Sequence, residues 1–463
     1  MRADPAIFKS YDIRGVYPTQ INEDAVYCIA RAFVHLFERS GKKPVEMKVI
    51  VGRDMRLSSP GLCLAFIDGL RSVGVSVFDA GLIAIDQMYF ALGELGFTAG
   101  AMITASHNPK EYNGVKLYRG GVDMVSAEEI QELRIMSERD DGRTVDSAGT
   151  VEAVSFDDAY ASKILAFADP SALKPFSVVL DAGNGMAGRV FPLVLRNLPR
   201  IKYTALYFEP DGSFPNHEPN PERLENTREI QKMVVKTKAD FGAAFDGDAD
   251  RITLIDDKGD ALRGDVITGI LAKHFLQKYG KGPIVYNVLC TRAVRDIIEK
   301  NGGTPVEWKT GHTHMKRKMR EVGAIFGGEL SGHLFFRDFY FAESSTLAFL
   351  LMCEIISKSG KKLSELAQEL RTYAYWSRYI YLDDVPAAAI ARVKETYQPR
   401  AARIDGIDGL TLHFQNPWWW FNIRPSNTET RISLTIESAH QVFTEEKKKE
   451  ILALTGGRVA GDA

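Results

Sequence analysis

Short apolar segments that end abruptly in polar loops recur along the chain and restrict its fold. Residues 49–51, 99–103, 178–180 and 241–245 are such segments. Runs of this length and apolarity are typical of buried strands. Helical patterns separate neighbouring strands, and this alternation is typical of a parallel sheet covered by helices. The sequence therefore predicts an α/β protein.

The length of the chain predicts several domains, because 463 residues exceed what a single hydrophobic core usually serves. We expect three similar α/β domains with mixed or parallel sheets, at residues 1–150, 151–256 and 257–373. The remaining residues, 374–463, have a different pattern of strands and two helices. They predict a small antiparallel α+β domain.

Composition excludes some partners. The chain has 58 Lys and Arg against 60 Asp and Glu, a net charge of −2, so no global field attracts nucleic acid or an acidic membrane. The four cysteines form no close pairs, which indicates free thiols in a reducing compartment. The first residues lack the apolar core of a secretory signal, and the longest apolar run, 346–356, is too short to span a bilayer. We expect a cytoplasmic protein.

The strand at 99–103 runs into Thr-Ala-Ser-His-Asn-Pro, residues 104–109. Asn-Pro continues neither a strand nor a helix easily, so Ser106 should lie on a turn at the strand's end. A serine there, beside His107, is a candidate nucleophile or phosphate carrier. Taken alone, a turn-forming serine with a surface histidine is the simpler alternative.

Three aspartates, Asp246, Asp248 and Asp250, follow the strand at 241–245. On a tight turn, this spacing can direct three hard oxygens at one cation, as Mg²⁺ requires. An EF-hand does not fit, because Arg251 stands where that loop needs glycine. The alternative is a solvated acidic turn. The arginine could hold a substrate phosphate or only form an intraloop salt bridge.

Two loops in the second half of the chain carry further polar groups. Residues 424–430, Arg-Pro-Ser-Asn-Thr-Glu-Thr, offer a guanidinium, hydroxyls and an amide that suit a phosphate, although such runs are often plain turns. Residues 329–333, Glu-Leu-Ser-Gly-His, offer groups that hydrogen-bond sugar hydroxyls and share a proton. Lys116 and His312 are isolated candidates for which a surface position is the default expectation.

Gly183, Gly185 and Gly188 match the dinucleotide-binding fingerprint after a strand, and Glu209 ends the next strand. This pattern supports a nucleotide-dependent oxidoreductase. A close packing turn between a strand and a helix is the simpler interpretation, because a dinucleotide-binding domain needs neither the serine turn nor the three-aspartate loop.

Together, the serine turn, the three-aspartate loop, the Glu-x-Ser-x-His loop and the Arg-x-Ser-Asn-Thr loop resemble the α-D-phosphohexomutase superfamily over essentially the whole chain. The sequence Gly-Glu-Leu-Ser-Gly-His, residues 328–333, looks most like that of the phosphomannomutase/phosphoglucomutase branch of this superfamily. The resemblance implies four domains around a central cleft. It also implies an isomerase that interconverts hexose 6-phosphate and hexose 1-phosphate, of mannose or glucose, through a phosphoserine and a hexose 1,6-bisphosphate.

The resemblance also implies roles for residues. Ser106 would carry the phosphoryl group and, with Asp246, Asp248 and Asp250, would bind one Mg²⁺ per active site. The groups implied around the reacting oxygens are Arg14, His107, Lys116, Arg251 and His333, with Lys116 and His333 as acid/base candidates. The groups implied to bind substrate are Tyr11, Lys309, His312, Glu329, Ser331, Arg424, Ser426, Asn427 and Thr428.

One position departs from the family pattern. Related mutases often have a basic residue where this chain has Leu289, and its loss would weaken a distal phosphate contact or change sugar preference. A phosphoglucosamine mutase is a close variant, against which Leu330 weakly favours neutral hexoses. A phosphatase that uses Asp246 and Asp248, and a non-catalytic sugar-phosphate binder, are further alternatives. The expected partners are small sugar phosphates, and the expected state is a monomer or weak homo-oligomer.

Overall fold

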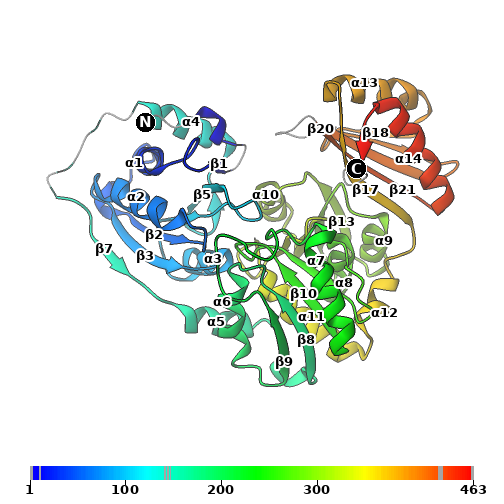
Figure 1. Ribbon diagram of the computed structural model, residues 1–463, viewed down its shortest axis with the longest axis horizontal. Helices are drawn as coiled ribbons and strands as arrows, with labels where there is room; N and C mark the ends of the chain where they lie inside the picture. Colours follow the sequence, from blue (N-terminus) through cyan, green and yellow to red (C-terminus); the bar gives the residue numbers. More distant parts are fainter. Residues whose placement is uncertain are drawn as a thin grey trace. The chain divides into compact units, whose positions relative to one another are not determined.

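The computed structural model describes residues 4–9, 12–139, 142, 145, 147–425 and 431–459 (Figure 1). The chain forms two compact units. The first comprises Met1–Leu262 and His333–Leu363, and the second comprises Arg263–Gly332 and Ser364–Ala463. Within the described part of the chain, no helix combines the length and apolarity needed to cross a membrane.

The first sheet has seven strands in the order β1-β5-β4-β2-β3-β7, with β6 paired to β5. Its strands β2, β3, β4 and β7 are mutually parallel, whereas β5 runs antiparallel to β4 and β1. Its strands are β1 (Ile13–Val16), β2 (Lys48–Arg53), β3 (Ser76–Leu82), β4 (Ala99–Ile103), β5 (Tyr112–Arg119), β6 (Asp123–Met124) and β7 (Val151–Ala153). The mixed sheet confirms the expected α/β class.

Four helices belong to this first sheet: α1 (Glu23–Glu38), α2 (Ser59–Arg71), α3 (Ile85–Glu94) and α4 (Ala127–Glu138). Helix α1 presents one apolar face and packs on α2 and α4 (Figure 1). Phe33 of α1 and Phe66 of α2 have no exposed surface, and they join the core formed by the sheet residues Val49 and Val51. This core fixes the carboxyl ends of β2 and β4, from which two functional loops leave.

The second sheet has the order β11-β10-β8-β9, with β8, β9 and β10 parallel and β11 antiparallel. Its strands are β8 (Phe176–Asp181), β9 (Ile201–Leu206), β10 (Phe241–Phe245) and β11 (Ile252–Ile255), and the associated helices are α5 (Asp157–Leu165), α6 (Ala187–Leu195), α7 (Leu224–Thr237) and α11 (Ser345–Ser359). A short hairpin, β15 (Leu334–Phe336) with β16 (Ala342–Glu343), precedes α11.

The glycine motif at residues 183–188 lies between β8 and α6 and forms a close packing turn. A Cβ on Gly188 would lie 1.9 Å from the carbonyl oxygen of Phe208, and one on Gly185 would lie 2.8 Å from the carbonyl oxygen of Gly247. These glycines are therefore required by the approach of neighbouring backbone, in agreement with the packing interpretation.

In the second unit, β13, β12 and β14 form parallel pairs. These strands are β12 (Pro283–Asn287), β13 (Thr304–Trp308) and β14 (Phe326–Gly328), and the nearby helices are α8 (Gly264–Tyr279), α9 (Arg292–Lys300) and α10 (His312–Val322), followed along the chain by α12 (Leu363–Gln368).

The C-terminal sheet is antiparallel throughout, in the order β18-β19-β20-β21-β17-β22, as expected for this part of the chain. Its elements are β17 (Ala374–Tyr381), α13 (Pro386–Tyr397), β18 (Arg403–Asp405), β19 (Leu410–Phe414), β20 (Trp419–Pro425), β21 (Arg431–Ser438), α14 (Gln441–Thr455) and β22 (Arg458–Val459). Trp419 and Phe421 pack in its core with Leu434. All four cysteines of the chain are free thiols.

Candidate active site

Ser106 lies on the turn that follows β4, whose five residues are all buried. Its backbone is in the left-handed region, with φ of 51°, and its N–H donates to Thr104 Oγ1 at 3.0 Å. Ser106 is buried, and its Oγ donates to Asp246 Oδ2 at 2.8 Å. A non-glycine residue in this region costs roughly 1–2 kcal/mol, and such conformations cluster at functional sites. Ser106 thus lies on a turn, as expected, but it is buried against the aspartate loop instead of at the surface.

Arg56 holds the serine loop in shape, and sequence reasoning missed it. Its fully buried guanidinium donates to the carbonyl oxygens of residues 106, 108, 109 and 112, at 2.6 to 2.9 Å. Its Nε lies 3.2 Å from Asp54 Oδ2. The order Arg-Asp-Met-Arg at the end of β2 contains two arginines, and nothing in the sequence marks Arg56 as the buried one.

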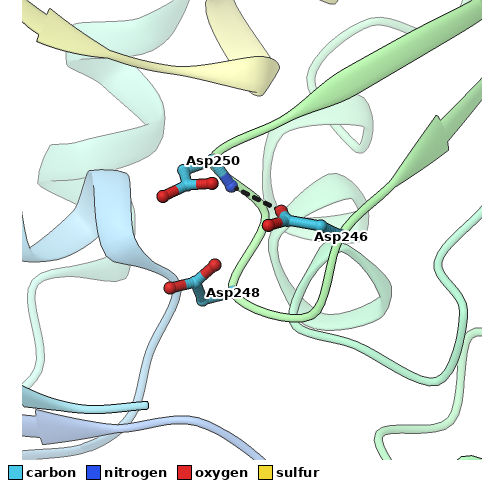
Figure 2. Close-up of side chains that lie close together, drawn as sticks. All are labelled: Asp246, Asp248 and Asp250. Carbon is cyan, nitrogen blue, oxygen red and sulfur yellow. Dashed lines mark hydrogen bonds between the residues drawn. The ribbon is translucent and has the colours of Figure 1, made fainter. Parts of the chain in front are cut away.

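The three aspartates occupy the tight loop between β10 and β11. The backbone N–H groups of Asp250 and Arg251 donate to Asp246 Oδ1 at 3.0 and 3.1 Å, and Figure 2 shows the first of these bonds beside the carboxylates. One ligand oxygen from each aspartate lies within 4.8 Å of the others, and all three residues are buried. The solvated-turn alternative is therefore wrong.

The donor set fits a hard divalent cation. Asp248 Oδ1 is buried and has no hydrogen-bond partner, which is costly for a carboxylate unless another group satisfies it. Its Oδ2 accepts from Thr104 Oγ1 at 3.2 Å and from Lys116 Nζ at 2.8 Å. Three carboxylates that converge in a buried loop are the oxygen ligands that Mg²⁺ prefers.

Lys116, on β5, is buried between two aspartates, so the expectation of a surface position is wrong. Its Nζ lies 2.8 Å from Asp248 Oδ2 and 3.0 Å from Asp250 Oδ2. Burial alone would lower the pKa of Lys116, but the two carboxylates outweigh it and hold that pKa well above its usual value. The side chain is therefore a fixed cation at neutral pH.

Asp246 and Asp250, at the two ends of the aspartate loop, have pKa values shifted in opposite directions. Burial, reinforced by Asp250 and Asp248, holds the pKa of Asp246 well above its ordinary value. Burial acts in the same direction on Asp250, but Lys116 and then His333 outweigh it and hold its pKa well below the ordinary value. The loop thus combines a carboxylate that stays ionised with one that resists ionisation until a cation arrives.

His107 lies beside the serine, with its Nδ1 3.3 Å from Ser106 Oγ. Burial lowers the pKa of His107 well below its usual value, and the nearby charges of Arg251 and Arg14 act in the same direction. The imidazole is neutral at pH 7. Arg14 donates from Nη1 to Asn108 Oδ1 at 2.6 Å and from Nη2 to Asp12 Oδ2 at 2.5 Å, which anchors it to the serine loop.

Arg251 connects the aspartate loop with two other segments of the first unit. Its Nε donates to His333 Nε2 at 3.3 Å, and its Nη1 pairs with Glu222. His333 Nε2 also lies 3.3 Å from Asp250 Oδ1. Arg251 therefore contacts residues outside its own loop, beyond the intraloop salt bridge that the sequence offered as an alternative.

In the second unit, Glu329 and Asn287 shape the loops that carry the expected sugar contacts. Glu329 is buried, and its Oε1 accepts from Gly311 N at 2.6 Å. Asn287, at the end of β12, accepts from Leu330 N through Oδ1 at 3.2 Å and donates from Nδ2 to Thr310 Oγ1 at 3.2 Å. Asn287 was not a sequence candidate. It holds the 309–312 loop and the start of the 329–333 loop together.

The remaining candidates of the second unit differ in exposure. His312 begins α10 and is buried, contrary to the expected surface position, whereas Lys309 is exposed and Ser331 half-buried. Arg424, on β20, donates from Nη1 to Asp408 Oδ2 at 2.9 Å. Leu289 is buried, and its carbonyl accepts from Tyr375 Oη at 2.7 Å.

Four predicted substrate contacts lie outside the described residues: Tyr11, Ser426, Asn427 and Thr428. Of the other candidates, the first unit brings together Ser106, His107, Lys116, Asp246, Asp248, Asp250, Arg251 and His333, with Arg14 attached through Asn108. The second unit contains Lys309, His312, Glu329, Ser331 and Arg424.

Family models match three successive parts of the chain. They describe phosphoglucomutase/phosphomannomutase alpha/beta/alpha domain I at residues 5–142, domain II at 158–259 and domain III at 263–373. The chain belongs to the phosphoglucomutase/phosphomannomutase family. The serine turn of this phosphoglucomutase/phosphomannomutase family member lies in the first matched domain, and its aspartate loop lies in the second.

Relatives of the family member match along nearly its whole length. A phosphomannomutase of Salmonella montevideo is 37% identical over 456 residues, which cover 96% of this chain and 98% of the relative. Phosphohexose mutases of Xanthomonas campestris pv. campestris strain B100 are 35% identical, with 97% and 99% covered. The crystal structure of a phosphoglucomutase/phosphomannomutase family protein from Burkholderia thailandensis has a TM-score of 0.87 at 30% identity and covers 99% of both chains.

Proposed function

We propose that the protein is a phosphohexomutase that interconverts hexose 6-phosphate and hexose 1-phosphate through a phosphoserine on Ser106. The observation that carries the proposal is the buried hydrogen bond of 2.8 Å from Ser106 Oγ to Asp246, on a loop with three converging carboxylates. A serine beside a magnesium-type donor set suits phosphoryl transfer, which depends on positioning and charge neutralisation.

In the first half-reaction, the bond between phosphorus and Ser106 Oγ breaks while a bond from phosphorus to the free hydroxyl of the sugar phosphate forms. The hydroxyl proton leaves to a base, for which His333 and the neutral His107 are candidates, and the leaving oxygen, Ser106 Oγ, takes up a proton. The product is a hexose 1,6-bisphosphate. In the second half-reaction, the bond between the other phosphorus and its sugar oxygen breaks while a bond from that phosphorus to Ser106 Oγ forms. The Ser106 hydroxyl gives up its proton, and the sugar oxygen takes one up.

The cations of the first unit then have defined tasks. Lys116, the other acid/base candidate of the sequence, is held protonated between two aspartates, and in this proposal it acts as a fixed cation beside the transferring phosphoryl group. Arg251 offers its guanidinium to the transferring phosphoryl group, and Arg14 supports the serine loop through Asn108. One Mg²⁺, bound by Asp246, Asp248, Asp250 and a phosphoserine oxygen, would supply further charge neutralisation.

The second unit would recognise the rest of the substrate. Glu329 and Ser331 bind sugar hydroxyls in this proposal, with His312 and Lys309 beside them. The phosphate that is not transferred would bind at Arg424, and Tyr11, Ser426, Asn427 and Thr428 stay predicted contacts. Because the bisphosphate must bind in both orientations, this site has to accept a phosphate on either end of the sugar.

Mannose and glucose phosphates are the proposed substrates. The support is the identity of 35 to 37% with proteins named phosphomannomutase and the likeness to a phosphoglucomutase/phosphomannomutase structure at 30% identity. The solved N-acetylphosphoglucosamine mutases are only 14 to 16% identical, so the glucosamine alternative has less support. Buried Leu289 supplies no cation to the distal phosphate, so we expect that Arg424 carries more of that contact.

The test is intact mass and peptide mapping of the purified protein. We expect an adduct of about 80 Da, the mass of one phosphoryl group, on Ser106. Ser106→Ala should lose the adduct and mutase activity, whereas Ser40→Ala, at an exposed serine after α1, should keep both. Absence of labelling by hexose bisphosphate would overturn the proposal. Hydrolysis of sugar phosphate by Ser106→Ala would instead favour a phosphatase that uses Asp246.

We also infer the cellular compartment and the oligomeric state of the enzyme. We expect the enzyme to act in the cytoplasm, and the support is that its four cysteines are free thiols. We also expect a monomer or a weak homo-oligomer, which light scattering during size-exclusion chromatography would test.

A further inference from the structure

Asp408 lies in the turn between β18 and β19 and joins two segments of the second unit. Its Oδ2 accepts from Arg424 Nη1 at 2.9 Å and from the backbone N–H of Thr310 at 3.1 Å. The side chains of Asp408 and Arg424 are only 21% and 23% exposed. One carboxylate oxygen therefore holds both a guanidinium and a loop of the preceding domain.

The turn that carries Asp408 is itself fixed. The backbone carbonyl oxygen of Asp408 accepts from Asn422 Nδ2 at 2.8 Å, and the same amide nitrogen donates to Thr411 Oγ1 at 2.9 Å. Gly409 has φ of 76°, and a Cβ there would lie 2.5 Å from Cβ of Arg424. The turn thus approaches β20 as closely as glycine allows, which leaves Asp408 little freedom to move away from the arginine.

The contact between Asp408 and Arg424 engages a single nitrogen of the guanidinium. A guanidinium has five N–H donors in a planar fork, and two parallel bonds to a phosphate need only one edge of it. Among the described residues, Asp408 is the one side-chain hydrogen-bond partner of Arg424. The carboxylate can therefore orient the guanidinium while a second edge stays available to an anion.

The same oxygen fixes the loop at residues 309–312. Thr310 N donates to Asp408, and the next N–H, of Gly311, donates to Glu329 Oε1 at 2.6 Å. Adjacent backbone donors thus connect Asp408 with the carboxylate proposed to bind sugar hydroxyls. Arg424 and the 309–312 loop are thus joined through two hydrogen bonds to one oxygen of Asp408.

We propose that Asp408 is a positioning residue for substrate binding, which orients Arg424 toward the non-transferred phosphate and ties it to the sugar-binding loop. The proposal rests on the proposed function, in which Arg424 binds that phosphate. Asp408 touches no reacting atom, so its effect is on the affinity for substrate and not on the phosphoryl transfer step.

Steady-state kinetics of four variants test the proposal: Asp408→Ala, Asp408→Asn, Arg424→Gln and the double variant Asp408→Ala/Arg424→Gln. Loss of a charge-assisted hydrogen bond predicts that Asp408→Ala raises KM for mannose 1-phosphate about tenfold, with kcat within about twofold. Asp408→Asn keeps an acceptor oxygen and should recover most of the affinity. In the Arg424→Gln background, Asp408→Ala should raise KM by a smaller factor than in the parent chain, because only its contact with Thr310 N is still lost.

The control is Asp405→Asn, on neighbouring β18, because Asp405 contacts His413 and Arg403 instead of Arg424. We expect an unchanged KM. An unchanged KM in Arg424→Gln would overturn the phosphate role of Arg424 in the proposed function. If Arg424→Gln raises KM but Asp408→Ala has no effect, or raises KM by the same factor with and without Arg424, the role of Asp408 in orienting Arg424 is overturned. Equal thermal melting of all variants separates these outcomes from unfolding.

Discussion

The Oγ of Ser106 donates a hydrogen bond of 2.8 Å to Asp246 Oδ2, although 140 residues separate the two along the chain. Each residue follows a buried strand, β4 in one sheet and β10 in another. The serine turn and the three-aspartate loop are therefore parts of a single constellation that neither loop could form alone.

Metal binding should stabilise the protein measurably. Because Asp248 Oδ1 is buried without a hydrogen-bond partner and burial beside Asp250 and Asp248 disfavours ionised Asp246, a divalent cation among the three should stabilise the folded state. Added MgCl₂ should therefore raise the melting temperature, and a chelator should reverse the rise. A ligand at 100 times its Kd adds about 2.7 kcal/mol to the free energy of unfolding. Thermal melts with and without Mg²⁺ measure this, and Asp248→Asn should abolish the rise. Asp240→Asn, outside the loop, is the control, and an equal response in both variants would contradict the assigned site.

Arg56→Met should destabilise the protein strongly. The substitution leaves Asp54 as an unpaired buried carboxylate and four carbonyls of the serine loop without their donor. Breaking a buried pair typically costs about 3–5 kcal/mol. Urea denaturation of the variant measures the loss. Arg39→Met, which removes an exposed pair with Glu132, should cost at most about 1 kcal/mol. Similar losses in the two variants would show that the buried network matters little.

Glu437 should make stability fall as the pH rises toward neutrality. Its carboxylate accepts from Arg292 N at 2.9 Å and Trp420 Nε1 at 2.7 Å, and burial raises its pKa from 4.5 to about 7. The folded state therefore binds a proton that the unfolded state has released between these two pH values, and the stabilisation present below pH 4.5 is lost as the pH passes 7.

The matched variant for this prediction is Glu437→Gln, which keeps the shape and an acceptor oxygen without ionising. Urea denaturation between pH 5 and pH 8 should show a shallower decline for the variant than for the parent chain. The variant should be the more stable of the two at pH 8. If the free energies of unfolding of the variant and the parent chain change with pH in parallel across the whole range, the raised pKa of Glu437 is ruled out.

Gly188→Ala tests the packing role of the glycine motif. A Cβ at this position would lie 1.9 Å from Phe208 O, so the backbone of the β8–α6 turn must shift. We expect a loss of several kcal/mol in urea denaturation. Gly323→Ala is the control, since its Cβ would meet nothing within 4 Å and only its φ of 64° opposes alanine, at about 1 kcal/mol. Comparable stability of the two variants would contradict the packing interpretation.

The sequence alone predicted the α/β class and the position of the main loops, because apolar strands ending in polar turns leave a strong local pattern. The clustering of Asp246, Asp248 and Asp250 was predictable for the same reason, since their spacing lies within one turn. Structure added that all three are buried and that one oxygen of Asp248 has no hydrogen-bond partner.

The residues that support the site were not predictable, because their partners are distant in sequence. Arg56 contacts carbonyls about 50 residues away, and Asp408 contacts Thr310, 98 residues away. No local pattern distinguishes either from an ordinary surface charge. Lys116 was singled out but expected at the surface by default, since only the fold reveals the two carboxylates that compensate for its burial.

Gly247 gives the serine turn and the aspartate loop a shared constraint. A Cβ on this glycine would lie 2.5 Å from the carbonyl oxygen of Ser106. The backbones of the two loops are therefore in direct contact, and this position has no room for a side chain. A replacement for either loop must therefore keep this close approach of the two main chains. Chimaeras that join the first domain of one family member to the second domain of another should succeed only when both loops have the same parent.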